Sequence, residues 1–191
     1  MKLTVSRLET SLGAVTLVST PAGLAGLAFE NRLDNLWRFL ESRFGSIESD
    51  TGGPPDPAAA ELRAYFEGAI GALERIRTDA GGTEFQRRVW TALRRIPGGC
   101  TASYSELARS IGQPTGFRAV ATANATNPVA IVIPCHRVIH ADGSISGYGG
   151  GVDRKKWLLC HEADHLPFAL GATIGVPADT SDLNRMREDR P

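Results

Sequence analysis

Two short stretches of the chain hold side chains that could do chemistry. In the first, Cys135 and His136 follow the apolar run 130–133. A thiol attacks as its thiolate, and neighbouring basic groups favour that form. In the second, residues 161–165 read H-E-x-x-H. On a helix, that spacing places two imidazoles on one face, where they could hold a zinc ion while Glu162 acts as general base.

The zinc interpretation meets two obstacles. A zinc hydrolase of this kind needs a long helix and a third ligand downstream. Leu166 and Pro167 end any helix just beyond His165, and neither histidine nor cysteine follows. Only a carboxylate could complete the ligand set. We therefore expect no metal, and we assign His161 and His165 to a helix end, where partial positive charge is favourable.

The three cysteines, Cys100, Cys135 and Cys160, stand far apart. Their odd number and spacing argue against a disulfide framework and exclude a four-cysteine zinc site within the chain. At least one thiol is therefore free, and burial is the default for each. For Cys135, the adjacent imidazole, Arg137 and the Gly-rich stretch 147–151 favour a nucleophile instead.

The chain of 191 residues carries no net charge, but its charges are unevenly distributed. Residues 82–165 hold ten Lys and Arg against six Asp and Glu, a net charge of +4 that leaves −4 on the remainder. This asymmetry favours an anionic partner for 82–165, although a solvated charged face gives the same pattern. Neither a signal peptide nor a membrane-length apolar stretch is present, so we expect a cytoplasmic protein without a membrane partner.

The first part of the chain reads as one α/β unit. The spacing of its apolar residues and its turn residues predicts an antiparallel meander over 1–30, a helix over 34–44 capped by Asp34, a polar loop over 49–57 and a helix over 58–67. A Gly-Gly pair at 81–82 marks a junction. We therefore predict an N-terminal domain over 1–81, a second domain over 82–165 and a polar, loosely held tail over 166–191.

The second domain begins with three predicted helices. A helical stripe runs over 85–96, with Thr83 as its N-cap. Ser103 and Glu106 form a capping box ahead of a short helix, and a third helix follows over 116–125. The last two helices, joined by a turn that contains glycine, indicate a helix-turn-helix.

The helix over 116–125 is poor in long polar side chains. Arg118 carries its only charge, among Gly116 and several alanines. A surface of small residues with one arginine suits close approach to a narrow DNA groove better than reading of a major groove. A buried alanine-rich helix explains the same composition without DNA.

The run 130–133 reads as a buried strand that leads into Cys135. An Asp-Gly pair at 142–143 predicts a hairpin turn, residues 147–151 a flexible loop, and residues 154–161 a final helix. The thiol would then lie between a strand and a glycine loop, where a ligand can approach the backbone closely.

Residues 133–138, Ile-Pro-Cys-His-Arg-Val, resemble the active-site signature of the 6-O-alkylguanine-DNA alkyltransferases, also called methylated-DNA–protein-cysteine methyltransferases. Further motifs of that family follow in the same order and spacing over 82–162: Gly82-Thr83-Glu84-Phe85-Gln86, Ser103-Tyr104, Arg118-Ala119-Val120, Asn127-Pro128, Gly147-Tyr148, and Leu158-Leu159 to Glu162. Residues 1–81 resemble the family's N-terminal domain only loosely. The resemblance implies an α/β (α+β) fold, with a ribonuclease-H-like N-terminal domain of antiparallel sheet and helices before a helical, winged-helix-like domain that carries the helix-turn-helix.

The resemblance further implies a DNA repair protein that acts once. It would flip 6-O-alkylguanine, or 4-O-alkylthymine, out of double-stranded DNA. The thiolate of Cys135 would take the alkyl group in a single displacement, and the stable thioether would leave the protein inactive. The reaction implied needs no cofactor. We expect a monomer, with clustering of copies on DNA left open.

The resemblance also implies roles for individual residues. Beside the nucleophile, His136 would take the thiol proton through a water, and Glu162 would orient that imidazole and stabilise its charged form. Tyr104 would help to rotate the phosphate and then protonate the leaving guanine. Asn127 would complete the catalytic set by tying the recognition helix to the active-site strand. Arg118 would be the finger that fills the vacated stack. The other DNA-binding residues would be Tyr104, Ser105, Gln113, Gly116, Phe117, Ala119 and Ala121. The base pocket would comprise Pro134, Val138, Tyr148, Gly149 and Gly150.

The sequence departs from the family at a few positions. Phe117 stands where many relatives carry a small residue, and Ala121 where glycine is frequent. Non-catalytic relatives replace the nucleophile, whereas this chain keeps Cys135. Two other interpretations stay open: a DNA-binding module or alkyl-damage sensor without catalysis, in which Cys135→Ala leaves function intact, and a zinc hydrolase, which needs stoichiometric zinc.

Overall fold

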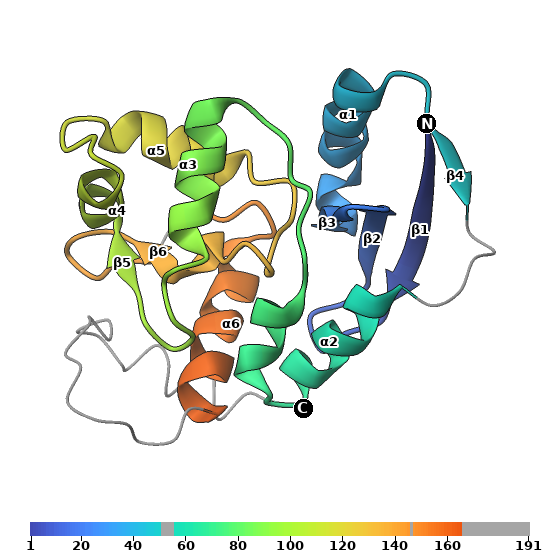
Figure 1. Cartoon of the computed structure of the whole chain (residues 1–191). Helices are drawn as coiled ribbons and strands as arrows, with labels where there is room; N and C mark the ends of the chain where they lie inside the picture. The colour runs from blue at the N-terminus through green and yellow to red at the C-terminus, as the bar shows by residue number, and fades with distance from the viewer. Residues whose placement is uncertain (51–55, 146, 166–191) are drawn as a thin grey trace.

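The computed structural model describes residues 1–50, 56–145 and 147–165, and it places a sheet-bearing part beside a mainly helical part (Figure 1). The first part holds a four-stranded sheet, and the second holds helices and a two-stranded sheet. The fold is therefore mixed α/β, as predicted. Among the described residues, no helix combines the length and apolarity needed to cross a membrane. The predicted tail, 166–191, lies outside the described residues, as do the positions 51–55 of the predicted loop.

The large sheet forms from the alternating residues near the N-terminus. Strands β1 (Lys2–Leu8), β2 (Val15–Thr20) and β3 (Gly23–Phe29) run antiparallel in sequence order, which confirms the predicted meander. Strand β4 (Glu48–Asp50) pairs with β1 in parallel, so the order is β3-β2-β1-β4. Because successive side chains point to opposite faces, the apolar residues of these strands supply two separate clusters, one on each side.

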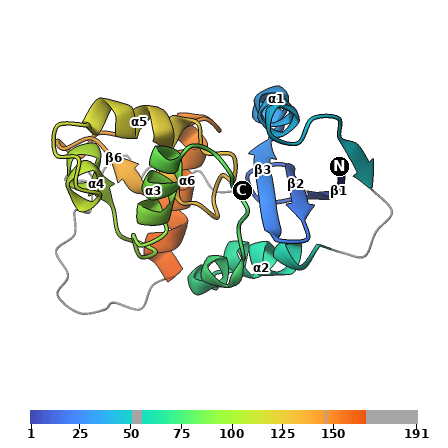
Figure 2. The same ribbon diagram turned by 45° about the horizontal axis from the view of Figure 1, so that its top comes forward.

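A helix covers each face of this sheet (Figure 2). On one face, α1 (Leu33–Phe44) packs Leu36 and Leu40 against Val18 of β2. On the other face, α2 (Pro57–Phe66) buries Tyr65 completely within the main core.

The helix starts of this part differ in their caps. The prediction that Asp34 caps α1 is wrong, because a 3-10 turn, η1 (Glu30–Arg32), leads directly into the helix, whose N-cap residue makes no side-chain cap bond. Asp34 lies instead in the first turn, where its charge suits the helix dipole. At α2, the Asp56 carboxylate accepts a hydrogen bond from the Ala58 N–H, which fixes the start of that helix.

The helical part begins as predicted. Thr83 caps α3 (Glu84–Leu93) in a complete capping box with Gln86, and a further capping box of Ser103 with Glu106 starts α4 (Tyr104–Ser110). Helix α5 (Phe117–Ala125) follows after a short turn and packs on both α3 and α4, and α6 (Val152–His165) closes the described chain. A 3-10 helix, η2 (Ile70–Arg75), precedes this part and packs on α2.

The prediction of a buried strand over 130–133 is wrong. The segment is buried but folds as a turn, in which Val132 N–H donates to the Ala130 carbonyl and Ile133 N–H to the Val129 carbonyl. Ile131 adopts a positive φ of 69°, which β-branched residues rarely do. Apolarity here signals burial alone, since a short apolar run carries no periodicity that separates a strand from a turn.

The Asp-Gly turn forms as predicted, since Gly143 N–H donates to the His140 carbonyl and His140 N–H donates to the Ser144 carbonyl. The strand before it, β6 (Val138–Ile139), pairs in parallel with β5 (Ala102–Ser103). This pairing brings the start of α4 next to the segment that follows Cys135.

The main apolar core runs through both parts of the molecule. It includes Leu17 and Phe29 of the sheet, Tyr65 of α2, Val89 of α3 and Leu158 of α6. A backbone bridge between Leu27 and Val129 joins the two parts directly. The two halves of the chain therefore share one core, and the division at residues 81–82 stays a prediction.

Candidate active site

Cys135 is the first residue of a short 3-10 helix, η3 (Cys135–Arg137), and it is 7% exposed. Its Sγ lies 3.2 Å from Nδ2 of Asn127, which also donates to the Ile133 carbonyl at 2.8 Å. The Asn127 Oδ1 accepts from the Val129 N–H at 3.0 Å. This amide therefore joins the residues just after α5 to the turn that carries the thiol.

Burial keeps the Cys135 thiol protonated. It raises the pKa of the thiol, while the Asn127 hydrogen bond and the positive charge of Lys155 act in the opposite direction. Since the thiolate is the reactive form, this cysteine needs a base that takes its proton.

The residue that follows Cys135, His136, has a neutral imidazole that can act as this base. His136 is fully buried, and its Nε2 lies 3.0 Å from Oε1 of Glu162. Although burial alone acts the other way, His136 and Arg137 hold the pKa of Glu162 well below its usual range, so the carboxylate is charged and His136 Nε2 is the donor. Burial lowers the pKa of His136, which favours the neutral ring. Its Nδ1 is then a proton acceptor, and that atom has no hydrogen-bond partner among the described residues.

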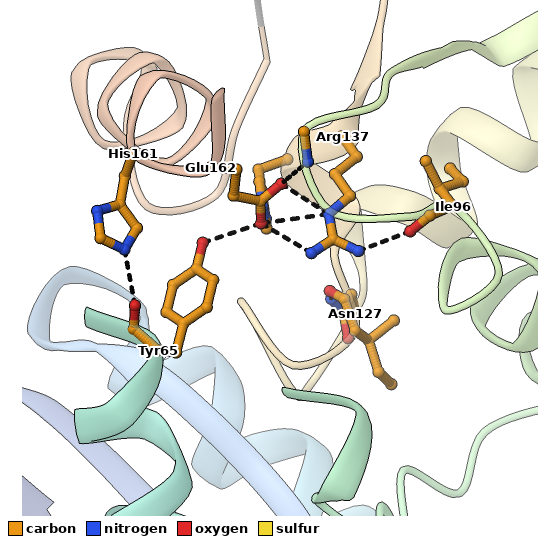
Figure 3. A network of polar contacts seen from close by, with 9 residues as sticks. Tyr65, Ile96, Asn127, Arg137, His161 and Glu162 are labelled. Atoms are coloured by element: carbon orange, nitrogen blue, oxygen red, sulfur yellow. Dashed lines mark hydrogen bonds and ion pairs between the residues drawn. The ribbon is translucent and has the colours of Figure 1, made fainter. Parts of the chain in front are cut away.

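Glu162 lies at the centre of a buried hydrogen-bond network (Figure 3). Arg137 donates from Nε to Oε2 at 2.9 Å and from Nη2 to Oε1 at 2.8 Å, and its Nη1 donates to the Ile96 carbonyl at 2.6 Å. The Tyr65 hydroxyl donates to Oε1 at 2.9 Å and the Gly99 N–H to Oε2 at 3.0 Å. These donors offset the cost of burying a carboxylate.

The histidines of the H-E-x-x-H stretch have other partners. His161 is buried, donates from Nε2 to the Tyr65 carbonyl at 2.7 Å, and stacks on Trp157 with ring centroids 4.7 Å apart. Helix α6 continues past the predicted end at residue 161, so His165 lies at the helix end, whereas His161 lies a turn earlier, inside the core. No group of three metal-binding side chains occurs within residues 1–50, 56–145 and 147–165.

A cavity of about 330 Å³ opens beside Cys135 between the two parts of the molecule. Three of the predicted pocket residues, Tyr148, Gly149 and Gly150, line it. A Cβ at Gly150 would lie 2.7 Å from the Tyr148 ring and 2.9 Å from the Phe29 ring, so only glycine lets the backbone pack this closely against both rings. The other two predicted pocket residues, Pro134 and Val138, are buried and are not among the lining residues.

Sequence reasoning missed several side chains of this site. The cavity is also lined by Arg32 and Phe39, from η1 and α1, and by Asn124 of α5. Lys155 of α6 is fully buried and donates from Nζ to the Val138 carbonyl at 2.6 Å; burial lowers its pKa to about 8. The positions of these four side chains follow from tertiary packing, which the spacing of residues along the sequence does not reveal.

Tyr104 occupies the first turn of α4 and is partly buried. Its pKa is raised by burial and by the negative charge of Cys135 as thiolate, while a contact with the Asn124 amide opposes the shift. Tyr104 is therefore a proton donor at neutral pH, electrostatically coupled to the thiol.

The remaining predicted DNA contacts gather around the start of α5. Phe117 and Arg118 are both exposed, and the Arg118 guanidinium lies over the Phe117 ring, 5.6 Å from its centroid. Ser105, Gln113 and Ala119 are exposed, while Gly116 and Ala121 are partly buried. Helix α5 is therefore not wholly buried, despite its many small residues, and its first turn faces solvent.

A family model described as "6-O-methylguanine DNA methyltransferase, DNA binding domain" matches residues 84–164. Among curated proteins, the chain is similar to a methylated-DNA–protein-cysteine methyltransferase of Mycolicibacterium paratuberculosis, 46% identical over 80% of this chain and 94% of the relative. The Salmonella typhimurium protein of that name is 39% identical over 85% of this chain and 96% of its own.

Solved structures give the same picture. The crystal structure of Mycobacterium tuberculosis OGT in complex with DNA matches with a TM-score of 0.69 and 38% identity, over 88% of this chain and 96% of that one. An O6-methylguanine-DNA methyltransferase of Pyrococcus kodakaraensis matches with a TM-score of 0.66 and 27% identity, over 84% and 98%. These matches cover most of the chain, so they include the sheet-bearing part, whose sequence resembles the family only loosely.

Proposed function

The chain belongs to the methylated-DNA–protein-cysteine methyltransferase family, and we propose that it repairs 6-O-alkylguanine in DNA by moving the alkyl group to its own Cys135. One observation carries the assignment to Cys135. Its buried thiol lies beside a cavity, and the next residue, His136, is a neutral imidazole hydrogen-bonded to the charged carboxylate of Glu162. 4-O-alkylthymine, which carries an alkyl ether on the corresponding edge, is a second substrate in this proposal.

The proposed reaction moves one alkyl group and two protons. The thiol proton passes, through a water, to Nδ1 of His136, whose Nε2–H is held by Glu162. The thiolate forms a bond to the alkyl carbon as the carbon–oxygen bond of the base breaks. Tyr104 gives its phenol proton to the departing guanine, which leaves more readily as a neutral purine. The thioether has no route back to a thiol, so each chain reacts once.

The damaged nucleotide must leave the duplex to reach a buried thiol. Arg118, exposed at the start of α5, is suited to enter the minor groove and fill the vacated stack. We propose that Phe117 adds an aromatic surface to this finger. Ser105, Gly116, Ala119 and Ala121 would then contact the backbone on either side, because their small side chains permit close approach, and the exposed amide of Gln113 would reach it with a hydrogen bond.

The two parts of the molecule each resemble a known kind of unit in this proposal. The strand order β3-β2-β1-β4, with only β4 parallel to its neighbour, supports a ribonuclease-H-like unit over 1–81. The α4-turn-α5 pair beside the short β5–β6 sheet supports a winged-helix-like unit with a helix-turn-helix over 82–165. The proposed partner is double-stranded DNA, bound by a monomer in the cytoplasm; clustering of copies along DNA is a separate, measurable property.

One experiment tests the reaction and its acceptor. The protein is incubated with duplex DNA that carries 6-O-methylguanine with an isotopic label in the methyl group. We expect one label per chain, on Cys135, and none on Cys135→Ala. Cys100→Ser is the matched control, since its thiol lies outside the cavity lining and its removal leaves labelling intact. Absence of label on the wild-type chain contradicts the proposal, and a DNA-binding module without catalysis gives that result.

A further inference from the structure

Tyr65 reaches the active-site carboxylate from the sheet-bearing half of the chain. It lies on α2, is fully buried, and donates its hydroxyl to Oε1 of Glu162 at 2.9 Å. The same oxygen accepts from His136 Nε2 at 3.0 Å and from Arg137 Nη2 at 2.8 Å. The phenol and the imidazole thus compete for one carboxylate oxygen.

The position of Tyr65 is fixed at both ends. His161, which precedes Glu162 on α6, donates to the Tyr65 carbonyl at 2.7 Å, and its ring meets the Tyr65 ring edge-on at 5.2 Å. Phe66 lies on another side of the phenol ring, with centroids 5.4 Å apart. Burial and the Glu162 charge raise the pKa of Tyr65 well above its usual value, so the hydroxyl keeps its proton and donates at every physiological pH.

We propose that Tyr65 is a positioning residue that limits how strongly Glu162 attracts the proton of His136, so that the sheet-bearing half of the chain tunes the base for Cys135. An imidazole must be neutral before it can accept a proton. A carboxylate with few other donors stabilises the imidazolium strongly, whereas one whose oxygen is shared among three donors stabilises it less. This inference rests on the proposed function, because it assumes that His136 takes the thiol proton.

The other ionisable groups around His136 are the same with or without the Tyr65 hydroxyl. Those that face it or its carboxylate partner are Glu162 and Lys155 of α6, Arg137 and Cys135 of η3, and Tyr148 of the glycine loop. Removing one phenol oxygen from α2 leaves each of these in place. A change in the titration of His136 can then be assigned to the lost hydrogen bond.

The test is the pH profile of a single turnover. Methyl transfer from 6-O-methylguanine DNA is followed between pH 5.5 and 9 for wild type and Tyr65→Phe, with DNA at saturation. Without the phenol, Glu162 stabilises the imidazolium more, so the midpoint of the acid limb should rise by roughly half a unit to one unit. At pH values well below the midpoint, the rate then falls about 3- to 10-fold more than the rate at pH 8. An unchanged midpoint overturns the inference, whatever happens to the rate itself.

Two further variants distinguish an effect of Tyr65 on the pKa of His136 from a purely structural role. Phe66→Leu disturbs the same aromatic cluster, and no hydrogen bond joins this side chain to Glu162; we expect lower thermal stability and an unchanged midpoint. In case Tyr65→Phe folds poorly, 3-fluorotyrosine inserted at position 65 keeps the ring and offers a more acidic, stronger donor. Its midpoint should move to lower pH, and a midpoint that stays or rises overturns the inference. Label transfer by the wild-type chain is measured first, so a failure of the proposed function is recognised separately.

Discussion

Arg137 and Glu162 form a buried, two-point ion pair, with Nε 2.9 Å from Oε2 and Nη2 2.8 Å from Oε1. The pair is anchored to the rest of the fold because Arg137 Nη1 also donates to the Ile96 carbonyl at 2.6 Å. Sequence reasoning assigned Arg137 to the thiolate, whereas its hydrogen bonds go to the carboxylate that holds His136. The arginine therefore supports the base rather than the nucleophile directly.

Removing Arg137 should destabilise the fold. In Arg137→Met, Glu162 stays buried without its main counter-charge, which costs about 3–5 kcal/mol of unfolding free energy. Urea denaturation measures the loss. Arg75→Met is the matched control, since it breaks an ion pair with Glu61 that is largely exposed, and its effect should be far smaller. Combining Arg137→Met with Glu162→Gln should restore part of the lost stability; losses that simply add would show that the two side chains are not coupled.

Replacing Glu162 alone should separate DNA binding from chemistry. Glu162→Gln keeps the shape of the side chain but loses the charge that stabilises the imidazolium, so we expect single-turnover transfer to slow by about 100-fold. Affinity for undamaged DNA should not change, because Glu162 is buried far from solvent. Asp164→Asn, an exposed change on the same helix, serves as control. A transfer rate equal to that of wild type would remove Glu162 from the mechanism.

The Glu162 network should also make stability depend on acid. The pKa of Glu162 is lower in the folded state than its ordinary value of 4.5, so the unfolded chain binds the proton first. Its contribution to stability is therefore fully present above the ordinary pKa and is lost as pH falls from there towards the folded pKa. Urea midpoints measured from pH 6 to pH 3.5 should fall more steeply for wild type than for Glu162→Gln. Parallel curves would contradict this assignment.

Local signals predicted much of what surrounds the site. The Thr83 and Ser103 capping boxes each involve residues three apart, and both helices begin where those signals place them. The pairing of His136 with Glu162 came from a family resemblance, and their side chains do meet in the structure. Tyr65 could not be found this way: it lies 97 residues from Glu162, and only the packing of α2 against α6 brings its hydroxyl to that carboxylate.

The error over 130–133 has a different origin. Its apolar residues signal burial correctly, since Ile131, Val132 and Ile133 are all nearly inaccessible. The segment forms a turn, and its backbone groups bond within the segment and to Leu27 of β3. Strand pairing depends on which neighbour has free backbone groups, and that information is absent from hydrophobicity.

Asn127 should set the reactivity of the thiol. Its Nδ2 donates towards Cys135 Sγ and opposes the increase in the pKa of the thiol that burial causes, so Asn127→Ala should raise that pKa further. Alkylation by iodoacetamide across pH, in a background of Cys100→Ser and Cys160→Ser, reports the thiolate directly. We expect a midpoint shifted to higher pH and transfer at neutral pH slowed about 10-fold, as a shift of one unit implies. Asn35→Ala, which removes an amide of α1 that lines the same cavity, should leave the midpoint where it is.

Phe117 should contribute to DNA binding through stacking. It is 44% exposed, so truncation costs little core packing, and its ring lies under the Arg118 guanidinium. A base that stacks on an exposed aromatic ring contributes about 1–3 kcal/mol, so Phe117→Ala should weaken binding to DNA about 5- to 150-fold. Fluorescence anisotropy measures the affinity, and a 2-aminopurine probe opposite the lesion measures flipping. Phe117→Trp should preserve both, because it keeps an aromatic surface. Val152→Ala removes another exposed apolar side chain, at the start of α6, and should change neither; equal effects of the alanine variants would show that Phe117 has no special contact with DNA.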